Sequence, residues 1–300
     1  MIEKITVNNG MDNPTEIELS NPYSHGINIS GIDGIGPGLI NITQVEMATI
    51  DGSTITSVRK PSRNIVFTIK PMFVTSVEDT RLRVYSLFPL KRFVRLDFQT
   101  ENRKAYIEGV VDKVEPNIFE EEVTMQVSMI CADPYFKAAS PGILEFSKTI
   151  PLFEFPFMNE GTTPQLLMGE IRDYLEQELF YEGDADTGIE IHIFMYGDVK
   201  EDIEIHNVAN RESMTIRVSK MGSKFGYLKA LDEIVVSTVK GNKYMKLIRE
   251  GISYDILNFL DRDVTWIQLR PGNNMLTYVA GASTYKLAIT MIYSILYAGI

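Results

Sequence analysis

The residues of this sequence that could take part in catalysis or metal binding are few: three histidines, one cysteine and some clustered carboxylates. His25 lies in a turn-like segment, while His192 and His206 lie in separate expected strands. A zinc site on a helix needs two histidines one turn apart with a carboxylate between them. Because this spacing is absent, we interpret all three histidines as structural and expect no metal site.

Cys131 is the only cysteine, so the chain cannot form an internal disulfide or a metal site with several cysteines. It closes the apolar run at residues 127–131. A cysteine in such a run is typical of a small buried side chain, whereas a reactive thiolate needs a polar, partly exposed setting. We assign Cys131 no chemistry.

The carboxylate clusters do not resemble a catalytic pair. Glu120, Glu121 and Glu122 form an acidic turn, which indicates a solvated loop tip because no second set of ligands is near. Asp184 and Asp186 lie in a Gly-Asp-Ala-Asp-Thr-Gly turn that structure alone explains. A hydrolase would need two placed carboxylates, or a nucleophile with its base. We therefore expect no catalytic residues, no cofactor and no enzyme.

A glycine-rich stretch at residues 30–38 could suggest a phosphate-binding loop. No Gly-Lys-Ser/Thr follows it, and it is not set between a strand and a helix. We interpret it as a plain hairpin or a flexible loop.

The charge balance disfavours a nucleic-acid partner, and the length of the apolar stretches disfavours membrane insertion. The net charge is −11, from 40 acidic and 29 basic residues, which would repel phosphates. The densest basic stretch, residues 81–95, is typical of a solvated face. The longest apolar stretch, residues 287–300, is shorter than a membrane-spanning helix and contains polar residues. We expect a buried final strand there, and no membrane insertion.

The pattern along the chain predicts a mainly β protein. Alternating runs separated by Gly, Asn and Ser predict strands at residues 1–8, 17–19, 40–45, 64–70, 93–98, 105–111, 123–129, 188–194, 214–218, 232–239 and 285–292. One helix is expected after the capping residue Ser76 and before Pro89. Its apolar residues Leu82, Tyr85 and Phe88 would cover the sheet.

Two prolines and small residues at 133–142 predict a domain boundary, giving domains at 1–140 and 141–300. The strand density of the second half favours a β-sandwich. The segment at 164–180 stays ambiguous, because Thr163 and Pro164 could also begin a helix through Tyr174.

The order of several short motifs resembles the phage distal tail protein family, which forms the baseplate hub ring of many long-tailed phages. The resemblance covers nearly the whole chain. It rests on residues 50–53, 64–68, 82–91, 106–111 and 130–136 in the first half, and on residues 183–188, 241–243, 251–253, 266–274 and 297–300 in the second.

The resemblance implies a split β-barrel-like N-terminal domain that forms a ring, usually of six copies, and a galectin-like C-terminal β-sandwich outside it. It also implies a strand near Tyr174. Partners would be copies of the chain, the tail tube protein and other baseplate or tail-tip proteins, in a virion or phage-tail-like particle assembled in the host cytoplasm. Glu201 and Asp202 replace an Asn-Pro pair that the family often shows, so this turn can differ in shape.

These observations leave three possible classes of function, and we expect the first, a structural ring protein. The alternative is a carbohydrate-binding module that attaches to a host-surface glycan, motivated by Trp266 and Tyr278. The third is a peptidoglycan hydrolase, for which Asp184 and Asp186 are a pair of carboxylates close together in the sequence.

A closed ring needs two unlike surfaces on each copy. We expect one of them at residues 30–38 and at the strands flanking Asp51 and Gly52, which have too little apolar content to form a core alone. Arg59, Lys60 and Arg63 follow this segment. They either meet a carboxylate face of the next copy or form a solvated basic turn.

Overall fold

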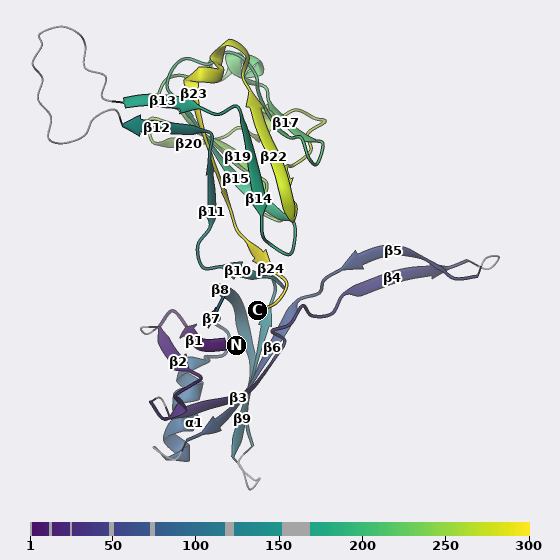
Figure 1. Ribbon diagram of the computed structural model, residues 1–300, viewed down its shortest axis with the longest axis vertical. Coiled ribbons are helices and arrows are strands. Elements are labelled where there is room, and N and C mark those ends of the chain that lie inside the picture. Colours follow the sequence, from purple (N-terminus) through teal and green to yellow (C-terminus); the bar gives the residue numbers. More distant parts are fainter. Residues whose placement is uncertain are drawn as a thin grey trace, which may run out of the picture. The chain divides into compact units, whose positions relative to one another are not determined.

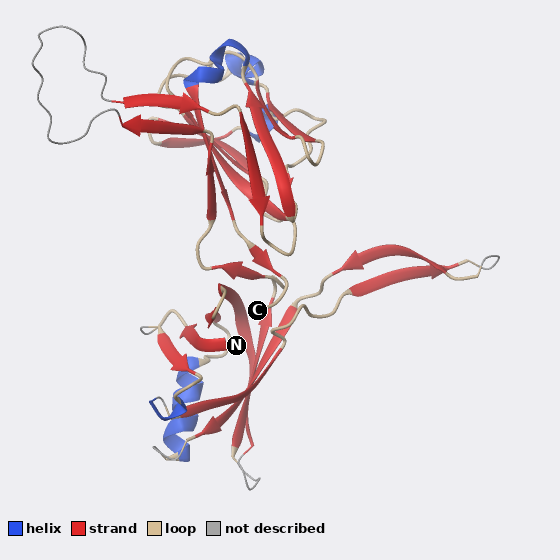
Figure 2. Cartoon of the chain, in the orientation of Figure 1, coloured by secondary structure: helices blue, strands red, loops and turns tan. Residues whose placement is uncertain are grey.

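A computed structural model describes residues 2–11, 14–24, 26–47, 51–72, 76–117, 123–151 and 169–300 of the chain. The chain is mainly β, as Figures 1 and 2 show. It divides into two compact units. Unit 1 contains Met1–Ala139 and Leu296–Ile300, and unit 2 contains Ser140–Ile295. Residues 296–300 therefore belong to unit 1, whereas the expected second domain ran to residue 300.

Unit 1 is built on a nine-stranded antiparallel sheet. Among the described residues no ladder joins the two outermost strands of its main path, so the sheet is not closed into a full barrel. In spatial order this path is β2 (Thr15–Glu18), β1 (Ile2–Asn8), β7 (Phe93–Thr100), β8 (Lys104–Asn117), β9 (Thr124–Cys131), β6 (Arg63–Pro71) and β3 (Ile27–Asp33). β10 (Phe136–Ala138) pairs with β8 and with β24 (Leu296–Tyr297).

Alternation of side chains gives this sheet one buried face, because every second residue of a strand points to the same side. Phe67 from β6, Leu96 and Phe98 from β7, and Val127 from β9 are all buried on it. Phe98 also packs edge to face on Phe136 of β10, with ring centroids 5.7 Å apart. The strands predicted at 64–70, 93–98, 105–111 and 123–129 are thereby confirmed.

The predicted helix is α1 (Val77–Leu87), and the Oγ of Ser76 accepts a hydrogen bond from the first turn as expected of a capping residue. The predicted apolar face was correct only for Phe88, which is buried and lies against Phe67 of β6, with ring centroids 5.9 Å apart. Leu82 and Tyr85 are exposed, while the helix buries Thr80, Val84 and Leu87. Thr80, Val84 and Leu87 lie on one face of the helix, because side chains three or four residues apart are neighbours on its surface. This is the buried face.

Two strands of unit 1 leave the sheet. β4 (Asn41–Glu46) and β5 (Ser53–Arg59) pair only with each other and form a hairpin that projects from the sheet in Figure 1. We call this hairpin the arm. Every residue of both strands is exposed. A short 3₁₀ turn, η1 (Pro22–Ser24), lies between β2 and β3.

Unit 2 is a β-sandwich of two antiparallel sheets. The larger sheet has the order β11 (Gly142–Glu145), β23 (Leu287–Tyr293), β15 (Thr187–Met195), β18 (Glu233–Ser237), β19 (Tyr244–Arg249) and β20 (Ile252–Asp255), with β21 (Gln268–Leu269) added to β15. The smaller sheet has the order β14 (Glu176–Tyr181), β22 (Gly272–Val279), β16 (Ile203–Asn207) and β17 (Glu212–Ile216). A separate hairpin joins β12 (Ser147–Pro151) to β13 (Gly169–Asp173), and short 3₁₀ turns follow at η2 (Val218–Ser223), η3 (Leu257–Phe259) and η4 (Gly281–Lys286).

The core of unit 2 lies between these two sheets and is aliphatic apart from a few aromatic rings. Ile191 and Ile193 of β15 face Ile205 of β16 and Leu276 of β22 in one buried cluster. The described part of the ambiguous segment is strand at β13 and β14, and Tyr174 lies in the short connection between them, whereas the resemblance implied a strand at Tyr174 itself. Thr163 and Pro164 lie outside the described residues, as do His25 and Glu120 to Glu122.

Two expectations about segments were wrong. Residues 287–300 do not form one buried strand, because they are divided between β23 in unit 2 and β24 in unit 1. The glycine-rich stretch is not wholly a loop, because Ser30 to Asp33 belong to β3 and pair with β6. At Gly34 φ is +84° and a Cβ would lie 2.1 Å from the carbonyl oxygen of Asn64, so only glycine fits.

Candidate functional site

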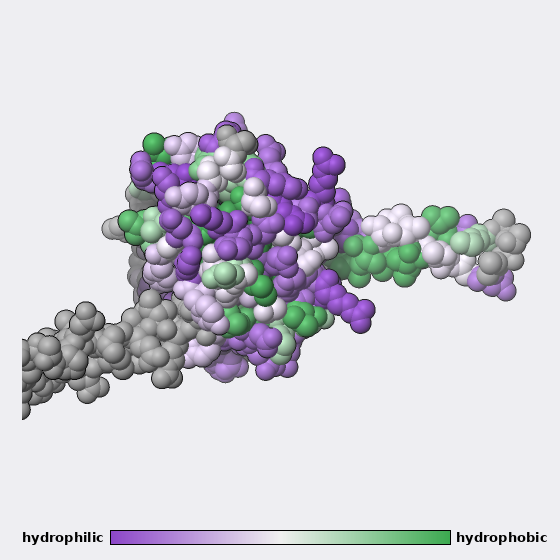
Figure 3. Space-filling view, turned by 90° about the horizontal axis from the view of Figure 1, so that it is seen from above, coloured by the Kyte–Doolittle hydropathy of each residue, from purple (hydrophilic) through white to green (hydrophobic). Residues whose placement is uncertain are grey.

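The arm presents an apolar face to solvent. Ile42 pairs with Val58 and Gln44 pairs with Ile55, so these four side chains lie on the same face of the hairpin. Ile42, Ile55 and Val58 are 50–61% exposed. Figure 3 shows apolar residues in green along one side of the arm. A lone two-stranded hairpin is marginally stable in water, so an arm of this kind gains stability when a partner covers it.

The predicted interface residues are divided between the two ends of the arm. Asp51 and Gly52 lie directly before β5 at the outer end and are exposed; Gly52 has a φ of +101°, which glycine adopts without strain. Arg59 ends β5 and is exposed. Lys60 and Arg63 lie at the base of the arm.

Arg63 is buried, with 6% of its surface exposed, although a solvent-facing basic segment was expected. Its guanidinium donates only to backbone carbonyls. Nε donates to Pro134 at 2.7 Å, Nη1 donates to Gly34 and Gly36 at 2.5 and 2.6 Å, and Nη2 donates to Ala298 at 2.6 Å. We call this arrangement the carbonyl cage. It joins segments that are far apart in the sequence.

The electrostatics of the cage agree with a structural role. Burial lowers the pKa of Arg63, because a desolvated cation is disfavoured. The guanidinium also lies over the ring of Phe136, 4.7 Å from its centroid. Lys60 is nearby, with Nζ 4.5 Å from the centroid of Tyr135 and 3.5 Å from the carbonyl oxygen of Ala298. Lys60 and Arg63 therefore brace the base of the arm.

Residues 296–300 are held to unit 1 along their length. Leu296 and Tyr297 pair with β10. The Nη1 of Arg103 donates to the carbonyl of Gly299 at 3.2 Å, and its guanidinium lies 4.4 Å from the centroid of Tyr297. The backbone N–H of Ile300 donates to the carbonyl of Ile35 at 3.1 Å. This returning segment thus completes the base of the arm together with Arg63.

A second apolar surface lies on the outer face of the nine-stranded sheet. Phe93 of β7 pairs with Val110 of β8, which pairs with Ile130 of β9. We call these three residues the outer stripe. Phe93 is 77% exposed and Ile130 is 44% exposed. They line a groove of about 700 Å³ that Leu90 and Tyr135 also border.

The polar side chains of unit 2 form structural contacts. His192 lies between two carboxylates, with Nδ1 2.7 Å from Glu233 and Nε2 3.0 Å from Glu190, and Tyr244 donates to Glu190 at 2.9 Å. Burial lowers the pKa of His192, but hydrogen bonds to Glu233 and Glu190 outweigh this effect and raise it overall. Both ring nitrogens are engaged, so neither is available to activate a nucleophile.

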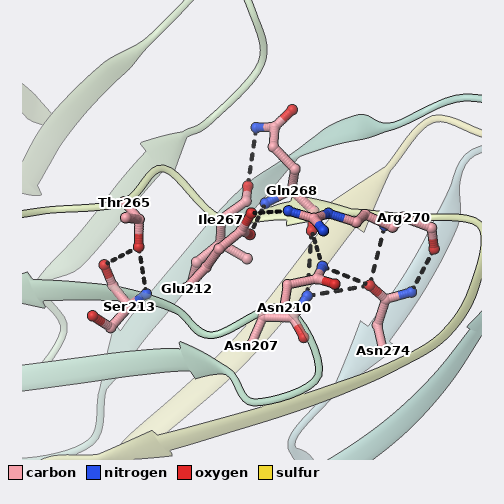
Figure 4. A network of polar contacts seen from close by, with 9 residues as sticks. All are labelled: Asn207, Asn210, Glu212, Ser213, Thr265, Ile267, Gln268, Arg270 and Asn274. Atoms are coloured by element: carbon pink, nitrogen blue, oxygen red, sulfur yellow. Dashed lines mark hydrogen bonds and ion pairs between the residues drawn. The ribbon is translucent and has the colours of Figure 1, made fainter.

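A buried amide network joins two turns of unit 2 (Figure 4). The Oδ1 of Asn274 accepts hydrogen bonds from the side chains of Asn207 and Asn210 at 3.2 and 3.3 Å, and from the backbone N–H of Arg270 at 3.1 Å. Its Nδ2 donates to the carbonyls of Arg270 and Gly272 at 2.8 and 3.1 Å. The network fixes the turn between β16 and β17 against the turn that precedes β22.

Other chemistry is not apparent in the parts of the chain that the structure describes. They contain no group of three or more His, Cys, Asp or Glu residues placed to hold a metal ion. They also contain no helix that is long and apolar enough to cross a membrane. Asp184 and Asp186 lie in the turn between β14 and β15. The Nε2 of His206 lies 3.5 Å from the Oε2 of Glu204.

A solved structure has a similar fold over both units. The SPP1 Dit (gp 19.1) protein, described as a paradigm of the hub adsorption apparatus in phages that infect Gram-positive bacteria, matches the chain with a TM-score of 0.61 at 14% identity. The match covers 97% of this chain and 98% of that chain, so it includes both units.

The chain has the fold of a phage Dit protein.

Two structures of the phage P2 baseplate in its activated conformation also match, one with Ca and one with Sr. Their TM-scores are 0.46 and 0.41 at 11% identity, and the matches cover 98% and 97% of each chain. No family model and no curated protein sequence matches the chain. The Dit fold confirms the predicted fold class, a mainly β chain with a split-barrel-like first domain, one α-helix and a C-terminal β-sandwich.

Three parts of this Dit fold were missed in the sequence analysis: the carbonyl cage, the returning segment and the outer stripe. A signal existed for the stripe, because Phe93 is out of phase with the buried residues Val94, Leu96 and Phe98. No local signal marks the cage, since Arg63 reaches carbonyls 27 to 235 residues away.

Proposed function

We propose that the chain is a structural, non-catalytic hub protein of a phage tail tip or of a phage-tail-like particle. In this role it forms a ring, six copies by the family resemblance, that joins the tail tube to the distal baseplate or the receptor-binding apparatus. It is assembled in the host cytoplasm and acts in the particle. The observation that carries the proposal is the likeness to the SPP1 Dit protein, which spans both units and nearly all of both chains.

The ring contact in this proposal is made by the arm. A cyclic assembly is heterologous, so one patch on each copy meets a different patch on the next. The arm offers such a patch because its apolar face is exposed and its strands pair only with each other. Asp51 and Gly52 at the outer end, and Arg59 on the exposed strand, are placed to contact the next copy. Lys60 and Arg63 contribute by bracing the base.

The net charge of −11 is compatible with a ring around a DNA passage, because an acidic surface does not hold phosphates. The proposal accordingly includes no specific nucleic-acid partner, no membrane insertion and no cofactor.

Light scattering after size-exclusion chromatography tests the ring. The wild-type chain should elute as a closed oligomer, and the double variant Ile42→Glu with Val58→Glu should elute as a folded monomer. The matched control is Thr43→Glu with Ser57→Glu, which places the same charges on the opposite face of the same arm. A strictly monomeric wild-type chain that is also absent from purified tail particles would contradict the proposal.

The carbohydrate-binding alternative loses its motivation. Tyr278 is fully buried and packs edge to face on Phe146, with centroids 5.5 Å apart. Trp266 packs against the core of unit 2, with the Nζ of Lys243 4.8 Å from its ring centroid. The buried ring of Tyr278 offers no platform for a sugar, and the ring of Trp266 is partly buried with Lys243 beside it. A host-surface glycan is therefore not proposed as a partner.

A further inference from the structure

We infer that the groove over the outer stripe is the surface that receives the apolar face of the arm from a second copy of the chain. The inference rests on the proposed function, because it names the other half of the ring contact. Both halves are present in unit 1, and each has an exposed apolar face.

The outer stripe is unusual for a solvated sheet face. Phe93, Val110 and Ile130 lie side by side on three neighbouring strands, because each pairs directly with the next. A sheet with one solvated face normally has polar residues on that face. Contiguous exposed apolar residues on such a face mark a surface that another molecule covers.

The arm matches this surface in chemistry. Its apolar face carries three β-branched side chains, Ile42, Ile55 and Val58, beside Gln44 and Glu46 on a ladder of two strands. The groove is lined by residues of three strands, and its volume of about 700 Å³ suits several aliphatic side chains. Burial of both apolar faces at once removes two exposed surfaces from water.

The two surfaces also satisfy the symmetry requirement. An arm and a groove are unlike patches on one chain, and a heterologous contact between them repeats from copy to copy. In β4 and β5, Glu46 is the only charged residue on the apolar face of the arm, since Arg59 pairs with Asn41 on the other face. On the arm's side the contact therefore depends on apolar burial more than on charge, although the groove is also lined by charged residues of both signs, among them Lys91, Glu108 and Lys137. We expect ring formation to change little between low and moderate salt.

Cysteine cross-linking between two singly substituted proteins tests the contact. Full-length Ile55→Cys is mixed with full-length Phe93→Cys and treated with a short flexible bis-maleimide. The native Cys131 does not compete, because it is buried and burial raises the pKa of its thiol to about 12. The expected product is a covalent dimer that contains one copy of each variant.

The matched control replaces Ile55→Cys by Thr54→Cys, the neighbouring residue on the opposite face of the arm. This mixture should give little covalent dimer. A second measurement uses Phe93→Glu, which should raise the concentration needed for ring formation by roughly tenfold or more. Its control is Leu82→Glu, an exposed apolar residue on α1 in the same unit, which should leave ring formation unchanged.

The possible outcomes distinguish failure of the groove contact from failure of the proposed ring function. A ring that forms without the Ile55–Phe93 cross-link, and that tolerates Phe93→Glu, overturns the groove assignment and leaves the proposed function standing. A wild-type chain that stays monomeric overturns both. Cross-linking of equal yield from the Thr54→Cys control shows random collision and also overturns the assignment.

Discussion

The outer faces of the two main sheets differ in a way that separates the roles of the units. In unit 1 the central strands carry the outer stripe, in which Phe93 and Ile130 are exposed and Val110 between them is half-buried. In unit 2 the central strand β15 instead carries Glu190 and His192, which are engaged with Glu233 and Tyr244.

In the proposed function, this difference assigns the contact with another copy to unit 1, whereas the polar residues of β15 on the larger sheet of unit 2 suit a solvated surface. The buried hydrogen-bond networks of the two units differ too. Unit 1 holds the base of its arm with the buried cation Arg63, and unit 2 fixes its turns with the neutral amide Asn274. A buried cation is costly unless every donor is satisfied, so the base of the arm is the more demanding arrangement.

The largest expected effect comes from Arg63→Met. This substitution leaves the carbonyls of Gly34, Gly36, Pro134 and Ala298 without their donor, so we expect unit 1 to lose about 3 kcal/mol of unfolding free energy. Amide hydrogen exchange in β6, β10 and β24 measures the loss.

The control for this prediction is Arg59→Met, which is exposed on β5 and should change the unfolding free energy by less than about 0.5 kcal/mol. Trp266 is the single tryptophan and lies in unit 2, so its fluorescence reports the unfolding of that unit. The urea midpoint measured in this way should be the same in both variants. Equal exchange rates in the two variants would show that the cage does not hold the base of the arm.

A smaller loss is expected from Asn274→Ala in unit 2. The substitution removes one buried acceptor and one donor from the amide network, and we expect a loss of about 2 kcal/mol. Urea unfolding followed by the fluorescence of Trp266 reports it. Asn273→Ala, the exposed neighbour, serves as the control and should unfold like the wild-type chain.

Features of the fold that are encoded by neighbouring residues could be predicted from the sequence, whereas features set by distant contacts could not. Strand positions such as residues 93–98 were predicted correctly, because alternation of apolar residues reports one buried face directly. The cap at Ser76 was also local and correct. The buried face of α1 was not, since Leu82 and Tyr85 are apolar yet exposed, and only the position of the sheet decides which row is covered.

The candidate site shows the same limit. A strand pair around Asp51 and Gly52 was expected, and the structure shows it as β4 and β5; that the pair leaves the sheet as an arm was not foreseen. Burial of Arg63 was not foreseen, because its neighbours Arg59 and Lys60 made it look like part of a solvated basic turn. The carbonyls that surround it come from three separate segments, which no spacing along the chain brings together.

The smallest effect is a pH dependence from His192. The pKa of His192 is raised in the folded state, so its protonated form adds stability that is fully present below the unfolded-state pKa of about 6.5. This contribution is lost as the pH rises through the folded-state pKa. We expect well under about 1 kcal/mol, since the pair partners are partly solvated.

Urea midpoints of unit 2 between pH 5 and pH 9 measure this dependence. The variant His192→Gln should lose this component of the profile, while His206→Gln should retain it. A profile that His192→Gln leaves unaltered would mean that Glu190 and Glu233 do not stabilise the charged ring.

The returning segment gives unit 2 a second attachment to unit 1, made by strand pairing and hydrogen bonds, in addition to the covalent connection after Ala139. The chain leaves unit 1 after β10 and re-enters it at β24, and these two strands are antiparallel neighbours, with Lys137 paired with Leu296. A pulling force on unit 2 would therefore load both strands in the same direction. It would act on the ladder between β10 and β8 rather than slide β10 along β24. Cleavage after Ala139 would leave unit 2 held only through the strand pairing and hydrogen bonds of residues 296–300.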